Sequence, residues 1–372
     1  MNQFCECKQD GWCNRYQREM KGRFRQICQG INCDLGTSAA FREQWSREIV
    51  DSFNRYNFPQ EMKPLSLLLK TDQAPGDAVA MTAAIYSLHK AHPGKYVTYV
   101  ESLYPEIFQY NPDVAGHFFP DETSLDYLTH LQMHYPAIHK SNSRGIHFMQ
   151  GWCEFLGFAL GINVPLLTNK PHLYFNTSIP QGDYWIVCSG GKNDFTNKLW
   201  GHENYQEVVI RTNIRFVQVG AFPSVNHPKL QGCRDEVGQT TLRQLFDLVR
   251  GSRGVLCGVS LLMHVAAALE KPCVVIAGGR EPVQWNAYPK QHYLHTVGML
   301  PCTSPQGDGG TEACWRSRVV PLNDGTTLDE HPCLYPVETT YARVPLFVRP
   351  ECMTLIKPNT VVELLRTIDS HL

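Results

Sequence analysis

Short apolar runs alternate with amphipathic stretches through the middle of the chain. The run at residues 64–70 (PLSLLLK) has the length of a buried strand, and apolar residues recur at helical spacing after Pro75-Gly76. Pro93-Gly94 ends that predicted helix. Further strands are predicted at residues 96–100, 114–119, 184–188, 215–219, 254–257 and 273–277, and further helices at residues 146–160, 203–211, 240–250 and 261–269. This alternation predicts an α/β fold with parallel sheets.

A segment rich in Pro and Asn, residues 165–182, separates two such α/β halves. The length of 372 residues fits two domains, at roughly 100 to 200 residues each. We therefore expect a cysteine-rich arm, two α/β domains and a cysteine-rich tail. Their predicted bounds are residues 1–36, 60–170, 180–300 and 301–372.

Composition narrows the class of protein. Hydrophobic residues make up 43% and charged residues 19% of the chain, which excludes a disordered regulator. The net charge of -1 argues against a protein that binds nucleic acid or anionic membranes over its whole surface. The sequence has no run of about 18 apolar residues, so we expect no membrane span. Its polar N-terminus does not resemble a secretory signal, and the predicted location is the cytoplasm.

Fourteen cysteines in a reducing compartment need an explanation other than disulfides. Five lie in the first 33 residues and four in the irregular C-terminal stretch. In the arm we expect a metal site of Cys5, Cys7, Cys13 and Cys28, with Cys33 as an alternative ligand and free thiols as the alternative interpretation. Basic residues in this arm keep nucleic acid or another subunit open as partners. Four isolated cysteines in apolar runs are predicted to be core residues: Cys153, Cys188, Cys257 and Cys273.

Three positions could provide chemistry at one edge of the predicted sheets. Asp77 follows a strand and opens a helix, so its carboxylate could face the crevice between the halves or simply cap the helix. In residues 254–279 a helix begins after a strand, and its first turn suits a diphosphate without a metal. His264, one turn inside, could reach a ligand or be a buried core histidine. Lys198 lies in a loop after another strand. A GxGxxG motif is absent, which argues against a dehydrogenase.

Several segments, taken in order, resemble a known family. They are GDAVAMTAAIYSLHKAHPG, YNPDV, KLW and GQTTLRQLFDLVRGSRGVLCGVSLLMHVAAALEKPCVVIAGG. Together, over roughly residues 62–290, they resemble the ADP-heptose:lipopolysaccharide heptosyltransferases, glycosyltransferase family nine. This resemblance implies the GT-B architecture, in which two Rossmann-like domains face a cleft that holds a nucleotide-sugar donor.

The resemblance also implies roles for individual residues. Asp77 matches the family's catalytic aspartate, a general base that would deprotonate an acceptor hydroxyl for attack with inversion. Lys198 matches its phosphate-binding lysine. The helix start that cradles the donor phosphates matches Ser260, Leu261, Leu262 and His264. No metal is implied for the transfer step.

One position departs from the family pattern. The family has an aspartate at the start of this helix motif, where this chain has Val259. Either the donor sugar therefore differs from heptose, or another group replaces that carboxylate. On the expected acceptor side, Arg144 and His147 could bind substrate, with packing as the alternative for His147.

The tail adds a second resemblance. The segments LPC, ACW, HPC and ECMTLIKPNTVVELL resemble the bacterial autotransporter heptosyltransferases, in which four C-terminal cysteines bind iron. The matching residues are Cys302, Cys314, Cys333 and Cys352, although the first two are spaced more widely than in that subgroup. Four thiolates suit structural iron or zinc.

The leading hypothesis is an inverting glycosyltransferase that moves a sugar from a nucleoside diphosphate to a hydroxyl of a protein, a glycan or another acceptor. A modified nucleic-acid base stays open as acceptor, and so does homo-oligomerisation, because the related subgroup forms rings. The alternatives are a GT-B-fold epimerase or hydrolase that acts on the nucleotide sugar, and a non-catalytic nucleotide-sugar-binding protein.

Overall fold

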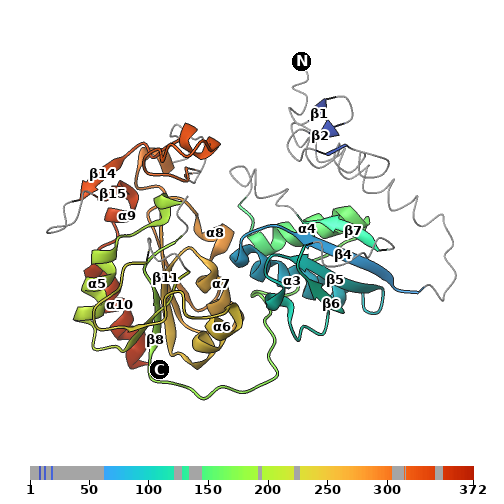
Figure 1. Ribbon diagram of the computed structural model, residues 1–372, viewed down its shortest axis with the longest axis horizontal. Helices are drawn as coiled ribbons and strands as arrows, with labels where there is room; N and C mark the ends of the chain where they lie inside the picture. Colours follow the sequence, from blue (N-terminus) through green and yellow to red (C-terminus); the bar gives the residue numbers. More distant parts are fainter. Residues whose placement is uncertain are drawn as a thin grey trace.

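Two parallel sheets, each with its own helices, form two lobes that lie side by side in the computed structural model (Figure 1). The described residues are 63–120, 128–133, 145–191, 195–221, 227–303, 314, 316–339 and 347–372, with three short strands near the N-terminus. Those strands, β1 (Lys8–Gln9), β2 (Trp12–Cys13) and β3 (Arg18–Glu19), pair in antiparallel fashion. The predicted α/β fold with parallel sheets is confirmed.

The N-terminal lobe has the sheet order β6-β5-β4-β7, and all its pairings are parallel. Its strands are β4 (Leu65–Thr71), β5 (Tyr96–Ser102), β6 (Gly116–Phe118) and β7 (Thr129–Gln132). Its helices are α3 (Pro75–Ala91), α4 (Phe148–Leu160) and the 3-10 turn η1 (Pro105–Phe108). Pro75 at the first turn suits a helix start, because its missing N–H would have no partner there.

The C-terminal lobe has a six-stranded parallel sheet in the order β10-β9-β8-β11-β12-β13. Its strands are β8 (Trp185–Cys188), β9 (Phe216–Gln218), β10 (Arg234–Asp235), β11 (Gly254–Gly258), β12 (Cys273–Gly278) and β13 (Gln291–His295). Its helices are α5 (His202–Arg211), α6 (Leu242–Gly251), α7 (Leu261–Ala268) and α8 (Val283–Asn286), with the 3-10 turn η3 (Thr196–Lys198). The chain starts at β8 in the middle and winds outward both ways, which is the doubly wound order of dinucleotide-binding folds.

Three strands of these sheets were absent from the prediction: β7, β10 and β13. All three lie at sheet edges, where each has one hydrogen-bonded neighbour. Their side chains are largely exposed or half-buried, so the segments lack the continuous apolar run that marks a buried strand. The predicted central strands, in contrast, have buried residues throughout, as in β8, β11 and β12.

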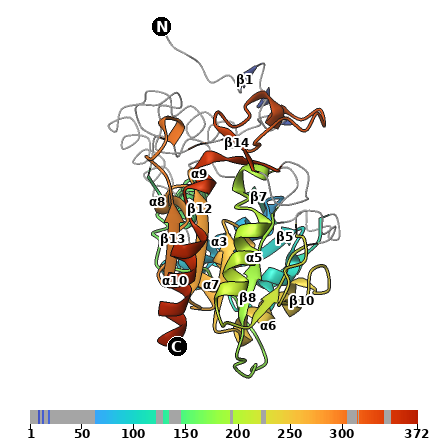
Figure 2. The ribbon, with the colours of Figure 1, turned by 90° about the vertical axis from the view of Figure 1, so that its left-hand side faces the viewer.

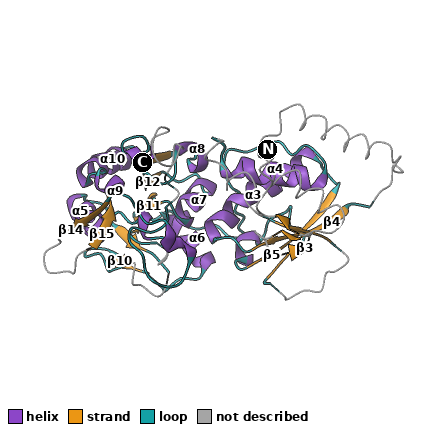
Figure 3. Ribbon diagram, turned by 90° about the horizontal axis from the view of Figure 1, so that it is seen from above, coloured by secondary structure: helices purple, strands orange, loops and turns teal. Residues whose placement is uncertain are grey.

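The tail after β13 returns to the C-terminal lobe. It consists of η5 (Pro301–Thr303), η6 (Thr327–Glu330), β14 (Pro336–Thr339), β15 (Phe347–Pro350), α9 (Glu351–Thr354) and α10 (Pro358–Ser370). Figure 2 shows α10 running beside α5 and the sheet, and Figure 3 shows β14 and β15 at the end of the molecule far from the N-terminal lobe. Within the described residues, no helix combines the length and the apolar character needed to cross a bilayer.

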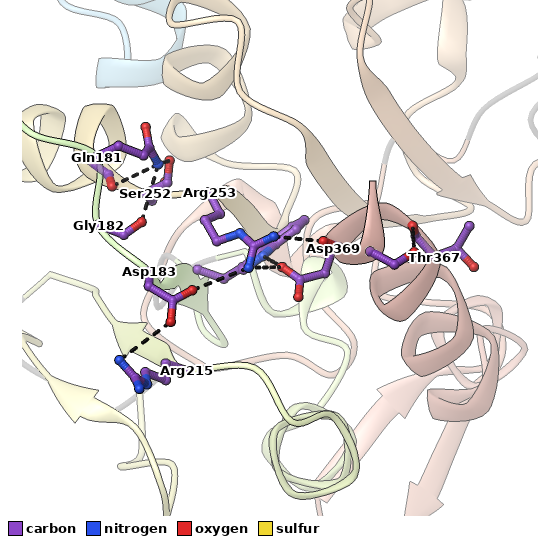
Figure 4. A network of polar contacts seen from close by, with 11 residues as sticks. Gln181, Gly182, Asp183, Arg215, Ser252, Arg253, Thr367 and Asp369 are labelled. Atoms are coloured by element: carbon purple, nitrogen blue, oxygen red, sulfur yellow. Dashed lines mark hydrogen bonds and ion pairs between the residues drawn. The ribbon is translucent and has the colours of Figure 1, made fainter. Parts of the chain in front are cut away.

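Polar contacts hold α10 to the strand starts of the C-terminal sheet (Figure 4). Trp185 on β8 donates its indole N–H to Asp369 Oδ1 at 2.8 Å, and Arg253 donates to the Asp369 carbonyl at 2.8 Å. The same arginine lies 3.3 Å from Asp183. Apolar residues of α10, among them Leu365, are completely buried against this sheet.

Leu365→Ala should therefore lower the free energy of unfolding by about 2–5 kcal/mol, because it leaves a cavity between α10 and the sheet. Urea denaturation followed by circular dichroism measures the loss. Leu372→Ala, at a position 58% exposed, is the matched control and should change little. Equal stability of the two variants would contradict the packing described for α10.

Candidate active site

Three segments meet at the carboxyl edge of the C-terminal sheet. The loop after β8 contains η3 and Lys198, α7 begins directly after β11, and residues 279–281 follow β12. Strands β8 and β11 are neighbours at the point where the winding direction of the sheet reverses. Ligands of doubly wound folds bind at this reversal, outside the carboxyl ends of the strands.

Lys198 forms an ion pair with Glu281, with 2.5 Å between Nζ and Oε1. Glu281 also accepts hydrogen bonds from Arg280 and Asn286. Burial lowers the pKa of Lys198, while the nearby Glu281 carboxylate acts in the opposite direction. Burial by itself would raise the pKa of Glu281, but Lys198 and Arg280 outweigh it and hold that pKa below its ordinary value. Each group therefore stabilises the charged form of the other.

The sequence analysis missed Glu281. The available signal was a carboxylate three residues past a buried strand, in the segment AGGREP. The sequence predicts the cation, Lys198, but its counter-ion lies 83 residues further along the chain. A partly buried ammonium group is stabilised by such a partner, because an unpaired charge removed from water is unfavourable.

The start of α3 in the N-terminal lobe packs against α7 in the C-terminal lobe (Figure 1). Gly76 makes this approach possible, since a Cβ there would lie 3.0 Å from Cδ2 of His264 and 3.3 Å from Cα of Leu261. The next residue, Asp77, lies near enough to influence the pKa values of Lys198 and Tyr288. The structure thus brings together Asp77, Lys198 and the α7 start.

His264 is a buried residue with one polar partner. It is 4% exposed, and its Nδ1 lies 2.7 Å from the hydroxyl oxygen of Tyr288. Burial, together with His147 and Lys198 and against the effect of Glu281, lowers the pKa of His264 to about 3. Burial also raises the pKa of Tyr288 well above its ordinary value. At neutral pH a neutral imidazole and a protonated phenol therefore share this hydrogen bond.

The first turn of α7 contains the other residues predicted to hold the donor. Ser260 is the N-cap, and its side chain makes no capping hydrogen bond. Its hydroxyl oxygen is buried without a hydrogen-bond partner of good geometry among the described residues, although it interacts with the Cys257 thiol. Leu262 is buried and Leu261 half-buried, while Val259 is buried in the apolar core. The backbone N–H groups of this turn are the groups that could face an anion.

His147 is the N-cap of α4, and its Nδ1 accepts a hydrogen bond from the Met149 N–H at 3.2 Å. Its ring packs edge-on against Tyr288, with 4.8 Å between centroids. Burial lowers the pKa of His147 to about 4, although the backbone carbonyls of Asn286 and Ala287 favour the protonated ring. His147 therefore lies in the contact between the lobes. Arg144 lies outside the described residues.

The four tail cysteines lie near one another. Burial raises the pKa of Cys302 to about 11 and that of Cys352 to about 12, and in both cases neighbouring thiols of this set add to the effect. Burial and the Cys314 thiol likewise raise the pKa of Cys333. In the part of the chain that the structure describes, no three or more Cys, His, Asp or Glu side chains are arranged to hold a metal ion.

The remaining predicted cysteines lie in the N-terminal arm and in the core of the lobes. Cys5, Cys7, Cys28 and Cys33 lie outside the described residues, and Cys13 is described only as part of β2. The prediction of four core cysteines is confirmed, since each is at least 93% buried: Cys153, Cys188, Cys257 and Cys273.

The tail also supports the loop that holds Lys198. Asn197, the residue before it, donates from its backbone N–H to the Ser317 carbonyl at 3.1 Å and from its side chain to the Arg316 carbonyl at 3.0 Å. On the other side, Trp200 donates its indole N–H to the Ile356 carbonyl at 2.9 Å. The position of this loop therefore depends on the folded tail.

Part of the chain is similar to known proteins. Residues 168–315 match the model of Glycosyltransferase family 9 (heptosyltransferase). Lipopolysaccharide heptosyltransferase 2 of Salmonella typhimurium is 31% identical over 140 residues, which cover 30% of this chain and 40% of that protein. The predicted resemblance is confirmed: residues 168–315 are similar to glycosyltransferase family 9, and the chain spans less than half of the length of this heptosyltransferase.

Solved structures share the fold over most of the chain. A glycosyl transferase family 9 protein from Veillonella parvula has a TM-score of 0.56 at 12% identity, over 84% of this chain and all of the other. The dodecameric iron-containing heptosyltransferase TibC from Escherichia coli, in complex with ADP-D-beta-D-heptose, has a TM-score of 0.56 at 14% identity, over 84% of this chain and 81% of the other.

Gly76→Ala should destabilise the contact between the lobes by about 1–3 kcal/mol, because the added methyl group meets His264 and the backbone of Leu261. Thermal denaturation followed by circular dichroism measures this loss. Gly145→Ala is the matched control in the same contact, where the new Cβ lies 3.4 Å from the flexible side chain of Gln284. A Gly76→Ala protein as stable as this control would show that α3 and α7 are not closely packed.

Proposed function

We propose that the protein is an inverting glycosyltransferase of GT-B architecture that moves a sugar from a nucleoside-diphosphate donor to an acceptor hydroxyl. The observation that carries this proposal is the juxtaposition of the α3 start, with Asp77, against the α7 start and the Lys198 loop. In this arrangement the Asp77 carboxylate of the N-terminal lobe lies near the Lys198 ammonium group and the N-terminus of α7, both in the C-terminal lobe.

In this proposal the two lobes have different tasks. Asp77 removes the proton from the acceptor hydroxyl as that oxygen attacks the anomeric carbon. Lys198 and the N–H groups at the start of α7 stabilise the departing diphosphate, with Ser260, Leu261 and Leu262 forming that turn. His264 is neutral and hydrogen-bonded to Tyr288, so it orients the site and adds no charge.

The proposed donor is a nucleotide sugar, without a particular sugar or base. TibC was solved with ADP-D-beta-D-heptose, which supports a nucleotide sugar as the donor here. Heptose itself is not carried over, because Val259 replaces the family's aspartate and packs into the core. This departure favours a second candidate, a protein that binds a nucleotide sugar without turning it over.

Asp77→Asn should reduce sugar transfer by about 10²–10⁴-fold, because an amide cannot accept the hydroxyl proton. Donor affinity should change little, since Asp77 is not among the groups proposed to hold the phosphates. A thermal-shift screen against nucleotide sugars selects the donor, and release of nucleoside diphosphate measures turnover. Asp72→Asn, at an exposed position just before α3, is the control. Unchanged turnover in Asp77→Asn would exclude this general base, and donor binding without turnover in the unaltered protein would favour the binding protein.

We further propose that the tail binds a structural metal ion. Its four thiols lie on η5, on the loops at Cys314 and Cys333, and on α9, near enough to influence one another's pKa values, and a set of thiolates suits zinc or iron. The related TibC contains iron. A bound ion would neutralise thiolates that burial disfavours and would link segments distant in sequence. A second thiolate site in the N-terminal arm remains a prediction, with Cys5, Cys7, Cys13 and Cys28 as its ligands. Assembly with further copies of the chain and a cytoplasmic location also remain predictions.

Cys352→Ser should lower the bound iron or zinc and the melting temperature, because the hydroxyl group is a poor ligand and the tail loses a link to β12. Elemental analysis of the purified protein and a thermal melt check the two effects. Cys233→Ser, at a half-buried position on the same lobe, should change neither. Equal metal content in both variants would remove the tail cysteines as ligands.

A further inference from the structure

Arg280 lies in the loop after β12, at the sheet edge that contains Lys198 and the start of α7. Its side chain is only 11% exposed. The guanidinium group donates from Nη1 to Glu281 and from Nε to the Arg316 carbonyl, the latter at 3.0 Å. The cation is therefore held in one position by a neighbouring carboxylate and by the tail.

Arg280 and Lys198 share two partners. Glu281 Oε1 bonds to both cations, so a single carboxylate oxygen bridges them. Both cations also lie near the ring of Phe195, with 5.7 Å from Lys198 Nζ and 5.2 Å from Arg280 Cζ to its centroid. The two positive groups are thus fixed side by side over one aromatic ring, where cation–π attraction adds to the ion pairs.

Charge balance at this edge depends on Arg280. Lys198 and Glu281 neutralise each other, so this pair by itself has no net charge with which to attract an anion. Arg280 gives the trio a net charge of about +1 in a poorly solvated place, where charge interactions are strong. Asp77, on α3, lies within electrostatic reach of Lys198 and adds no positive charge, while His264 is neutral. Without Arg280 the cluster would offer a diphosphate no excess positive charge.

We propose that Arg280 is a second cation that binds the diphosphate of the donor beside Lys198, with Glu281 as the positioning residue that holds both. The inference deepens the proposed function and rests on it. A guanidinium group suits this task, because its fork of N–H donors matches phosphate oxygens and it remains charged when desolvated. The ligand class is a nucleoside diphosphate, free or as the leaving group of a nucleotide sugar.

Isothermal titration calorimetry of the full chain with ADP, UDP and GDP, and with the parent nucleosides, tests the proposal. Arg280→Gln should weaken binding of the preferred diphosphate by about 10- to 100-fold, as expected for a lost charge-assisted hydrogen bond. Nucleoside affinity should not change, because a nucleoside has no phosphate. Arg280→Lys should restore part of the loss, and its retained charge provides a second measurement if Arg280→Gln does not fold. Arg234→Gln, which removes an exposed arginine on the same lobe, should bind as the unaltered protein does.

The outcomes separate this inference from the proposed function. Diphosphate binding that is lost in Lys198→Ala but unchanged in Arg280→Gln would overturn the role of Arg280 and leave the transferase proposal standing. Equal losses for diphosphate and nucleoside in Arg280→Gln would also overturn it, because they would indicate a merely structural residue. An unaltered protein that binds none of the three diphosphates would contradict both proposals.

Discussion

The close approach of α3 to α7 is the constraint on which the arrangement of the candidate site depends. Gly76 favours it, because a Cβ at this position would lie 3.0 Å from His264 Cδ2 and 3.3 Å from Leu261 Cα. Each lobe begins a helix at the carboxyl edge of its own sheet, and the contact brings the two edges together. Asp77 of one lobe and Lys198 of the other are thereby placed within electrostatic reach.

Charge at this edge is balanced by buried groups. Removing Lys198 and Glu281 from water is unfavourable for either ion alone, and their pairing, with Arg280 and Asn286 bound to the same carboxylate, offsets that loss. A site organised before its ligand arrives needs little rearrangement when an anion binds. His264 and His147, at the contact between the lobes, have pKa values of about 3 and 4 and are neutral at physiological pH. They therefore add no charge to this edge of the sheet.

The C-terminal tail contacts the carboxyl edge of the C-terminal sheet and stabilises the loops there. Backbone carbonyls of Arg316 and Ser317 accept hydrogen bonds from the Lys198 loop and from Arg280, and α10 packs on the same sheet. Three features therefore belong to one structural unit: the cysteine cluster, the cationic pair and the central strands. The tail that contains the thiols therefore contacts the Lys198 loop directly.

Patterns in the sequence were sufficient to predict the central strands, most helices, the α/β class and the family resemblance, because buried strands have continuous apolar runs and helices have a 3.6-residue period. It also predicted Asp77, Lys198 and the α7 start as candidate site residues, and the structure brings these segments together. Edge strands such as β13 were missed, because one partner and a half-exposed surface leave no such run. Only the tertiary structure paired Lys198 with Glu281, placed His147 against Tyr288 and brought the tail behind the lysine loop. These contacts join residues far apart in the chain, and no local periodicity records which distant side chains become neighbours after folding.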